Sequence, residues 1–195
     1  LHDALPIYVG MVIQVPCAVL AGDVPLNAFL QFGHSLFNDR SESLDKYVRD
    51  VSKENGLIVF AVDWRGFSRF DLPAFGRTLL YKPEIFQRIV YNIWQGFIDN
   101  YVGQAVVTDY VQRNYVDSVG DVSTVPFMFY GISMGGILGS GYTAFAGSFD
   151  RAVLSVPGIP FSLLFTRSVL FGPPLELLSL TMFGARQKRL LFIIL

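Results

Sequence analysis

The chain has 195 residues, of which 52% are hydrophobic and 16% charged, and its net charge at pH 7 is −1. A charge this close to zero argues against nucleic acid or an anionic membrane surface as a partner. The length favours one domain with a sizeable core, and the apolar content is typical of a parallel sheet buried on both faces.

The first elements are short. Residues 8–20 are apolar and β-prone with Pro16 in their midst, which predicts early edge strands. Residues 28–32 form a short apolar run, which predicts a strand, and residues 33–38 follow as a loop. Edge strands and one further strand are therefore expected before the first long helix.

A helix is predicted next. Ser41 is a candidate N-cap, and Gly56 stands just past the expected end. The apolar positions between them follow helical spacing: Leu44, Tyr47, Val48 and Val51. This stripe is expected to face the core.

Residues 57–62 are an uninterrupted apolar run, which indicates a strand covered on both faces. A longer helix is expected to start near Pro83, since proline suits the first helical turn. Adjacent apolar pairs recur every four residues from Ile85 to Tyr101, with polar residues between them. We expect the apolar face of this helix, including Trp94 and Ile98, to lie on the sheet.

Three further elements complete the alternation. Residues 126–130 predict a buried strand, residues 134–146 a helix, and residues 152–156 a fourth strand ended by Pro157. Strands that alternate with helices predict an α/β fold with a mostly parallel sheet and right-handed crossovers.

The motif Gly131-Ile132-Ser133-Met134-Gly135 stands between the last predicted strand–helix pair. It has the form of a nucleophile elbow, in which a sharp turn presents a serine hydroxyl at the edge of the sheet. Ser133 is the candidate nucleophile and needs a histidine base steered by a carboxylate. The backbone N–H groups of Met134 and Leu36 are the candidate oxyanion donors.

From Gly33 to about Ser168 the chain resembles the α/β-hydrolase superfamily, and within it bacterial lipase/esterase-like proteins. Three motifs carry the resemblance: Gly33-His34, Asp63-x-Arg65-Gly66-x-Ser68 and Gly131-x-Ser133-x-Gly135-Gly136. The resemblance implies that Ser133 attacks a small-molecule ester or amide to form an acyl-enzyme, and that Leu36 and Met134 form the oxyanion hole. It also implies that His34, Asp63 and Arg65 support the loops. Ser35 departs from the glycine that usually follows the histidine.

The family's catalytic acid and base are missing. No histidine follows Ser133, and only two carboxylates do, Asp150 and Glu176. Asp150 precedes the fourth predicted strand, and Glu176 falls in what resembles the start of a lid. We therefore expect residues 1–195 to be a single, C-terminally incomplete α/β-hydrolase domain that is inactive alone. In this interpretation residues 159–195 begin a lid or cap, and residues 1–7 need not belong to the native fold.

Two other interpretations stay open. The missing base favours a non-catalytic α/β-hydrolase-like binding or scaffold protein. The uncharged stretch 127–149, with Gly131, Gly135 and Gly139 at G-x-x-x-G spacing, is also typical of a transmembrane helix. Ten of its 23 residues are Gly, Ser or Thr, which argues against that helix, and we expect no transmembrane span.

The sequence indicates little about cofactors or cellular compartment. The chain has two histidines, His2 and His34, and one cysteine, Cys17. These are too few for a ligand cluster, so no metal and no cofactor is expected. No signal-peptide pattern is recognisable, and cytoplasmic and secreted locations both stay open.

Overall fold

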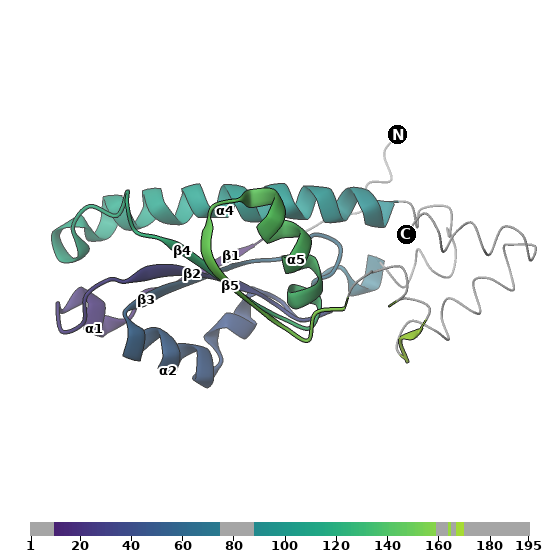
Figure 1. Cartoon of the computed structure of the whole chain (residues 1–195), viewed down its shortest axis with the longest axis horizontal. Helices are drawn as coiled ribbons and strands as arrows, with labels where there is room; N and C mark the ends of the chain where they lie inside the picture. Colours follow the sequence, from purple (N-terminus) through teal and green to yellow (C-terminus); the bar gives the residue numbers. More distant parts are fainter. Residues whose placement is uncertain (1–9, 75–87, 159–163, 165–166, 170–195) are drawn as a thin grey trace, which may run out of the picture.

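The computed structural model describes residues 10–74, 88–158, 164 and 167–169. In these residues a five-stranded sheet with the order β1-β3-β2-β4-β5 carries helices on both faces (Figure 1). The strands are β1 (Met11–Gln14), β2 (Ala28–Gly33), β3 (Leu57–Val62), β4 (Phe127–Ile132) and β5 (Phe149–Ser155). β1 runs antiparallel to β3, and the other pairs are parallel. The expected fold class, a mostly parallel α/β sheet flanked by helices, is confirmed.

The helices divide between the two faces. They are α1 (Cys17–Leu20), the 3-10 turn η1 (Arg40–Leu44), α2 (Lys46–Asn55), α4 (Arg88–Val119) and α5 (Met134–Ala146). α2 lies on one face of the sheet and α4 and α5 on the other (Figure 1). Val48 of α2 packs on Leu30 and Val59, whereas Val107 of α4 packs in the cluster that contains Phe29 and Phe60.

The first predicted strand region is partly wrong. Only residues 11–14 pair with β3, and residues 17–20 form the helix α1 instead. Pro16 explains the change because it has no N–H for a strand ladder. Its carbonyl instead accepts the N–H groups of Val19 and Leu20 at 3.0 and 3.2 Å, which begins the helix.

The first long helix starts later than predicted. Ser41 lies inside η1, where its N–H donates to the Asp39 carboxylate at 2.7 Å, so Asp39 is the cap of that turn. The predicted apolar stripe is wrong in part, since only Val48 is buried and Leu44, Tyr47 and Val51 are exposed. Ser52 takes the inner position by donating its hydroxyl to the Leu57 carbonyl at 2.7 Å. The predicted end is confirmed, because Gly56 caps α2 with φ of 63°.

Helix α4 is rotated relative to the prediction. Trp94, Ile98 and Tyr101, which were expected to face the sheet, are exposed. Phe97, which lies on the predicted apolar face, is buried as expected. The other positions that face the sheet are small or polar: Gly96, Asn100, Gly103 and Gln104. A Cβ at Gly103 would lie 2.7 Å from Val62 Cγ2, so glycine lets the helix approach β3. Residues 83–87 of the predicted helix lie outside the described residues.

A network of neutral hydrogen bonds explains this rotation. Gln31, buried in β2, donates to the Asn100 side-chain oxygen at 3.0 Å and accepts from the Tyr142 hydroxyl at 3.0 Å. Gln104 donates to Gln31 at 3.2 Å and to Tyr142 at 3.1 Å, and accepts from Ser148 at 2.8 Å. Burying an amide requires such partners, so these contacts decide which face of α4 lies inside. The network joins β2, α4 and α5.

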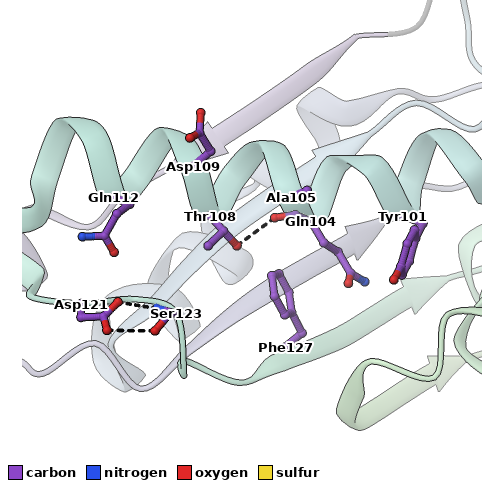
Figure 2. A pocket seen from close by; sticks show the side chains of 9 residues that line it. All are labelled: Tyr101, Gln104, Ala105, Thr108, Asp109, Gln112, Asp121, Ser123 and Phe127. Carbon is purple, nitrogen blue, oxygen red and sulfur yellow. Dashed lines mark hydrogen bonds between the residues drawn. The ribbon is translucent and has the colours of Figure 1, made fainter.

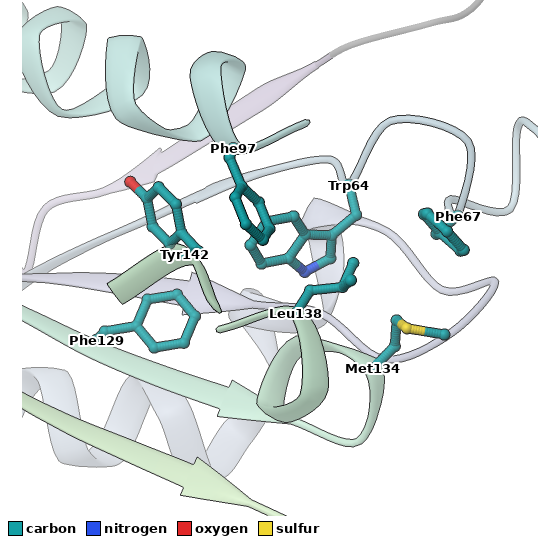
Figure 3. Close-up of a cluster of buried hydrophobic side chains, with 7 residues drawn as sticks. All are labelled: Trp64, Phe67, Phe97, Phe129, Met134, Leu138 and Tyr142. Carbon is teal, nitrogen blue, oxygen red and sulfur yellow. The ribbon is translucent and has the colours of Figure 1, made fainter. Parts of the chain in front are cut away.

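An aromatic cluster closes the core beside this network (Figure 3). The Trp64 ring lies 6.2 Å from Phe97 and 5.8 Å from Tyr142, and Phe129 lies 5.8 Å from Tyr142. Met134 and Leu138 of α5 belong to the same buried cluster. The start of α5 is thereby fixed against the loop that follows β3.

The predictions for the later elements are close to the observed bounds. α5 covers residues 134–146 as expected, and β5 begins three residues earlier than expected, so Asp150 lies within the strand. β5 is an edge strand whose Val153 is 58% exposed. Among the described residues, no helix is long and apolar enough to span a membrane. Residues 1–7 and nearly all of the expected lid at 159–195 lie outside the described part of the chain.

Candidate active site

Three loops meet at the carboxyl edge of the sheet. Gly33 at the end of β2 pairs with Gly131 near the end of β4, and β3 runs parallel to β2 on its other side. Carboxyl ends of parallel strands lie at one edge of a sheet. Residues 33–40, residues 63–71 and the turn at Ser133 are therefore neighbours.

Ser133 occupies a strained turn between β4 and α5. Its backbone has φ of 53° and ψ of −114°, and the residue is exposed although its neighbours Gly131 and Met134 are buried. Its N–H donates to the Ser155 carbonyl at 3.0 Å, and its carbonyl accepts the Ile137 N–H at 2.9 Å. A non-glycine residue in such a conformation costs roughly 1–3 kcal/mol. The backbone is fixed on both sides while the residue faces solvent.

The motif glycines are required for steric reasons. A Cβ on Gly135 would lie 1.9 Å from the Gly33 carbonyl oxygen, and one on Gly131 would lie 2.2 Å from the Gly135 oxygen. Neither contact is possible for a real side chain. The start of α5 therefore packs directly on the ends of β2 and β4 only because both positions lack a side chain.

Two backbone N–H groups near this turn are the candidate oxyanion donors. Within the described part of the chain, neither Leu36 N–H nor Met134 N–H has a hydrogen-bond acceptor. Leu36 shares a peptide unit with the Ser35 carbonyl, which accepts the His34 Nδ1–H at 2.8 Å. Because a peptide unit is planar, this bond also fixes the direction of the Leu36 N–H.

His34 links two loops and keeps no free ring nitrogen. Its Nδ1 donates to Ser35 O, and its Nε2 accepts the Trp64 N–H at 2.8 Å. The side chain is fully buried, and this burial lowers the pKa of the imidazole below its usual value. A neutral imidazole with both nitrogens engaged cannot take a proton from Ser133. The other histidine, His2, lies outside the described residues.

Asp63 and Arg65 each tie a loop to another element. The buried Asp63 carboxylate accepts the Arg40 N–H at 2.7 Å and forms an ion pair with the Arg40 guanidinium. Arg65 donates its Nε–H to Asp99 of α4 at 2.7 Å. These contacts hold residues 63–66 between η1 and α4.

Sequence reasoning missed Glu42 and Asp71. The Glu42 carboxylate accepts the Ser35 N–H at 2.7 Å and the Ser35 hydroxyl at 2.8 Å. Asp71 accepts the N–H of Gly66 at 3.0 Å and the Ser68 hydroxyl at 2.7 Å. The Asp39-x-x-Glu42 spacing of a capping box was an available signal, but Glu42 reaches Ser35 instead of the helix start.

The described residues bring no acid to Ser133 from the later part of the chain. Asp150 lies at the amino end of β5, opposite the carboxyl end that contacts Ser133 through Ser155. Glu176 lies outside the described residues.

Of the aromatic residues in the loop after β3, Trp64 and Phe67 are buried and Phe70 is exposed. No group of three or more potential metal ligands occurs within the ranges that the structure describes.

Comparisons with known proteins give structural neighbours alone. No family model and no curated protein matches the chain. A carboxyl esterase from Bacillus coagulans is 18% identical with a TM-score of 0.45, and covers 88% of this chain and 46% of its own. A cold-adapted esterase from an Arctic intertidal metagenomic library is 19% identical with a TM-score of 0.46, and covers 88% of this chain and 61% of its own. Est1E from Butyrivibrio proteoclasticus is 12% identical with a TM-score of 0.46, and covers 84% of this chain and 55% of its own.

The chain spans about half the length of the solved structures that it matches. At this identity the likeness concerns the arrangement of the backbone. The first two of these solved structures are esterases by name.

Proposed function

We propose that this chain forms part of a serine hydrolase of the α/β-hydrolase superfamily that cleaves carboxylic esters, or amides, through an acyl-enzyme on Ser133. The observation that carries the proposal is the backbone of Ser133, strained at φ of 53° yet exposed at the carboxyl edge of the sheet. A fold keeps such strain where a side chain must be presented in one direction.

In the proposed reaction the Ser133 Oγ attacks the carbonyl carbon of the substrate, and a base takes the hydroxyl proton. The negative charge that develops on the carbonyl oxygen is stabilised by the N–H groups of Met134 and Leu36. Both donors are free of other acceptors among the described residues. Collapse of the tetrahedral intermediate expels the alcohol or amine, which takes a proton from the base, and water then hydrolyses the acyl-enzyme.

The base and the acid of this mechanism come from outside the described residues. His34 is excluded as the base because Ser35 and Trp64 engage its two nitrogens. His34, Asp63 and Arg65 instead support the loops that bear the Leu36 donor. The proposal assigns the chain the nucleophile and the oxyanion donors, and predicts that residues 1–195 alone turn over very slowly.

A fluorophosphonate probe tests the nucleophile, since it labels an activated serine. We expect the complete protein to be labelled, and Ser133→Ala to abolish labelling. Ser140→Ala is the matched control, because Ser140 lies on the same helix and its hydroxyl donates to Ile137 O at 2.7 Å. Equal labelling of Ser133→Ala and the unchanged protein would contradict the proposal.

The second candidate is a non-catalytic binding or scaffold protein with the same fold. It is favoured by one observation, that His34 is fully engaged and is the sole histidine within the described ranges. This candidate predicts that the complete protein resists the probe and hydrolyses no ester even though it is folded. Labelling that depends on Ser133 would exclude it.

A further inference from the structure

The outer side of α4 carries a row of exposed apolar side chains. Tyr91, Trp94, Ile98 and Tyr101 recur at alternating steps of three and four residues. Tyr91 is 73% exposed and Trp94 55% exposed. Alternating steps of three and four make the narrow seam with which one helix packs on another.

Phe145 of α5 widens this row and stiffens it. Its ring lies 6.4 Å from Trp94 and 6.4 Å from Tyr101, in both cases edge to face. We define these five side chains as the aromatic ridge: Tyr91, Trp94, Ile98, Tyr101 and Phe145. Because rings hold one another in place, little side-chain entropy remains to be lost when the ridge binds a partner.

The same row continues along α4 into a groove (Figure 2). Ala105, Thr108 and Gln112 line one wall, and Asp121 and Ser123 line the other, around a cavity of about 610 Å³. Phe127 at the start of β4 also lines it, and Tyr101 stands where ridge and groove meet. The aromatic ridge and the groove therefore lie one after the other along α4.

Charge argues for a protein partner with a similar surface. The ridge has no charged side chain, and Asp109 beside the groove is paired with Arg113 at 2.7 Å. Residues 88–119 contain two basic residues, Arg88 and Arg113, and Arg113 is paired with Asp109, so the helix has no basic cluster of the kind that binds anionic lipid. Two copies of this surface can approach without strong repulsion.

We propose that the aromatic ridge of one copy packs into the groove of a second copy, giving an antiparallel α4–α4 homodimer with a twofold axis near Tyr101. Trp94 lies seven residues before Tyr101 and Thr108 seven residues after it. Both are therefore about 10 Å from the axis along the helix. The ridge of each copy meets the groove of the other, which is the reciprocity that a twofold interface requires.

The available area is sufficient for a stable dimer. An aromatic side chain buries about 150–250 Å², so the exposed parts of the ridge amount to roughly 500 Å² per copy. Two ridges with two matching groove walls then bury on the order of 2,000 Å². Stable, specific interfaces bury about 1,200–2,000 Å².

Light scattering and sedimentation of the full chain over a range of concentrations test the proposal. We expect a dimer that Tyr91→Glu, in the ridge, and Ala105→Glu, in the groove, each weaken at least about tenfold. Val106→Glu is the matched control, because Val106 is exposed on another face of α4. Circular dichroism verifies that each variant is folded. A full chain that stays monomeric to about 100 µM, or a control that weakens the dimer equally, would overturn the proposal.

Cross-linking tests the position of the axis. The single native cysteine, Cys17, is exposed, so the background is Cys17→Ser. Tyr101→Cys should form a covalent dimer under mild oxidation, since an axis at residue 101 brings its two copies together. Val106→Cys should not. Binding of a monomeric chain to neutral lipid vesicles through Trp94, read as a blue shift of its fluorescence, would overturn the dimer in favour of a lipid partner.

Discussion

Two groups of polar side chains inside the fold differ in their charge and in what they hold. The group at the carboxyl edge is ionisable and fixes loops: His34, Glu42 and Asp63. The group between the sheet and its helices is neutral at physiological pH and fixes α4 and α5: Gln31, Asn100, Gln104 and Tyr142. His34 and Asp63 are as deeply buried as Gln31, so the two groups differ in the partners that satisfy them. The partners are backbone groups and Arg40 at the edge, and neutral side chains in the network.

This contrast has a consequence for stability. Removing a member of the neutral network leaves buried amides without partners at every pH. Removing His34 from the edge group changes stability in a way that depends on pH, because burial lowers the pKa of its imidazole. Unfolding measurements on variants of each group, at more than one pH, separate these two behaviours.

The largest effect is expected for Gln31→Leu. It removes the acceptor of Tyr142 and Gln104 and the donor to Asn100, and should lower the free energy of unfolding by about 3 kcal/mol. Urea unfolding at pH 6 and pH 8 should give the same loss. Gln95→Leu, on the exposed side of α4, is the control and should change stability by less than about 0.5 kcal/mol. If Gln31→Leu lost as little stability as the control, the hydrogen-bond network would not decide which face of α4 lies inside.

Asp63→Asn should have the next largest effect. The amide keeps the volume but loses the charge that pairs with Arg40, whose side chain is 28% exposed. We expect a loss of about 2 kcal/mol in urea unfolding, because the half-buried Arg40 guanidinium loses a charge-assisted hydrogen bond. Asp109→Asn breaks an exposed pair with Arg113 and should lower the free energy of unfolding by at most about a few tenths of a kcal/mol. Equal losses in the two variants would mean that burial adds nothing to the Asp63 pair.

His34 should make stability sensitive to acid. Burial lowers its pKa in the folded chain below the unfolded value of about 6.5, so the unfolded chain binds more protons below that pH. The free energy of unfolding should therefore fall as the pH falls through and below about 6.5. His34→Gln should flatten this part of the profile. An acid profile identical in the unchanged chain and His34→Gln would contradict the assignment.

The smallest effect concerns the strained turn. Ser133→Gly removes the side chain that makes φ of 53° unfavourable, although glycine also gains entropy in the unfolded chain. We expect Ser133→Gly to be more stable than Ser133→Ala by about 1 kcal/mol. Thermal unfolding of the two variants side by side measures the difference. A less stable glycine variant would show that the turn stores no strain.

Local signals predicted the centre of the sheet well. Strand β3 and helix α5 have the predicted bounds because an uninterrupted apolar run and closely spaced glycines specify them within a few residues. The rotation of α4 could not be predicted in this way. It depends on Asn100 and Gln104 meeting Gln31, about seventy residues earlier in the chain, whereas hydropathy alone assigns those amides to solvent.

The candidate site likewise has a part that the sequence predicted and a part that it did not. The turn at Ser133 follows from its own five residues, because Gly131 and Gly135 are needed at the contact with β2. Glu42 was missed because its partner Ser35 is seven residues away across a loop, where no regular spacing applies. The roles of Ser133, Leu36 and Met134 stay predictions until the probe experiment is done.

The hydrogen bond from Ser133 N–H to Ser155 O joins the turn to the last residue of an edge strand. That amide proton can exchange with deuterium only when the end of β5 separates from the turn. Its exchange rate therefore measures how often the end of β5 separates from the turn. Any molecule or segment that covers β5 should slow this single amide, and the slowing would be visible without touching the serine side chain.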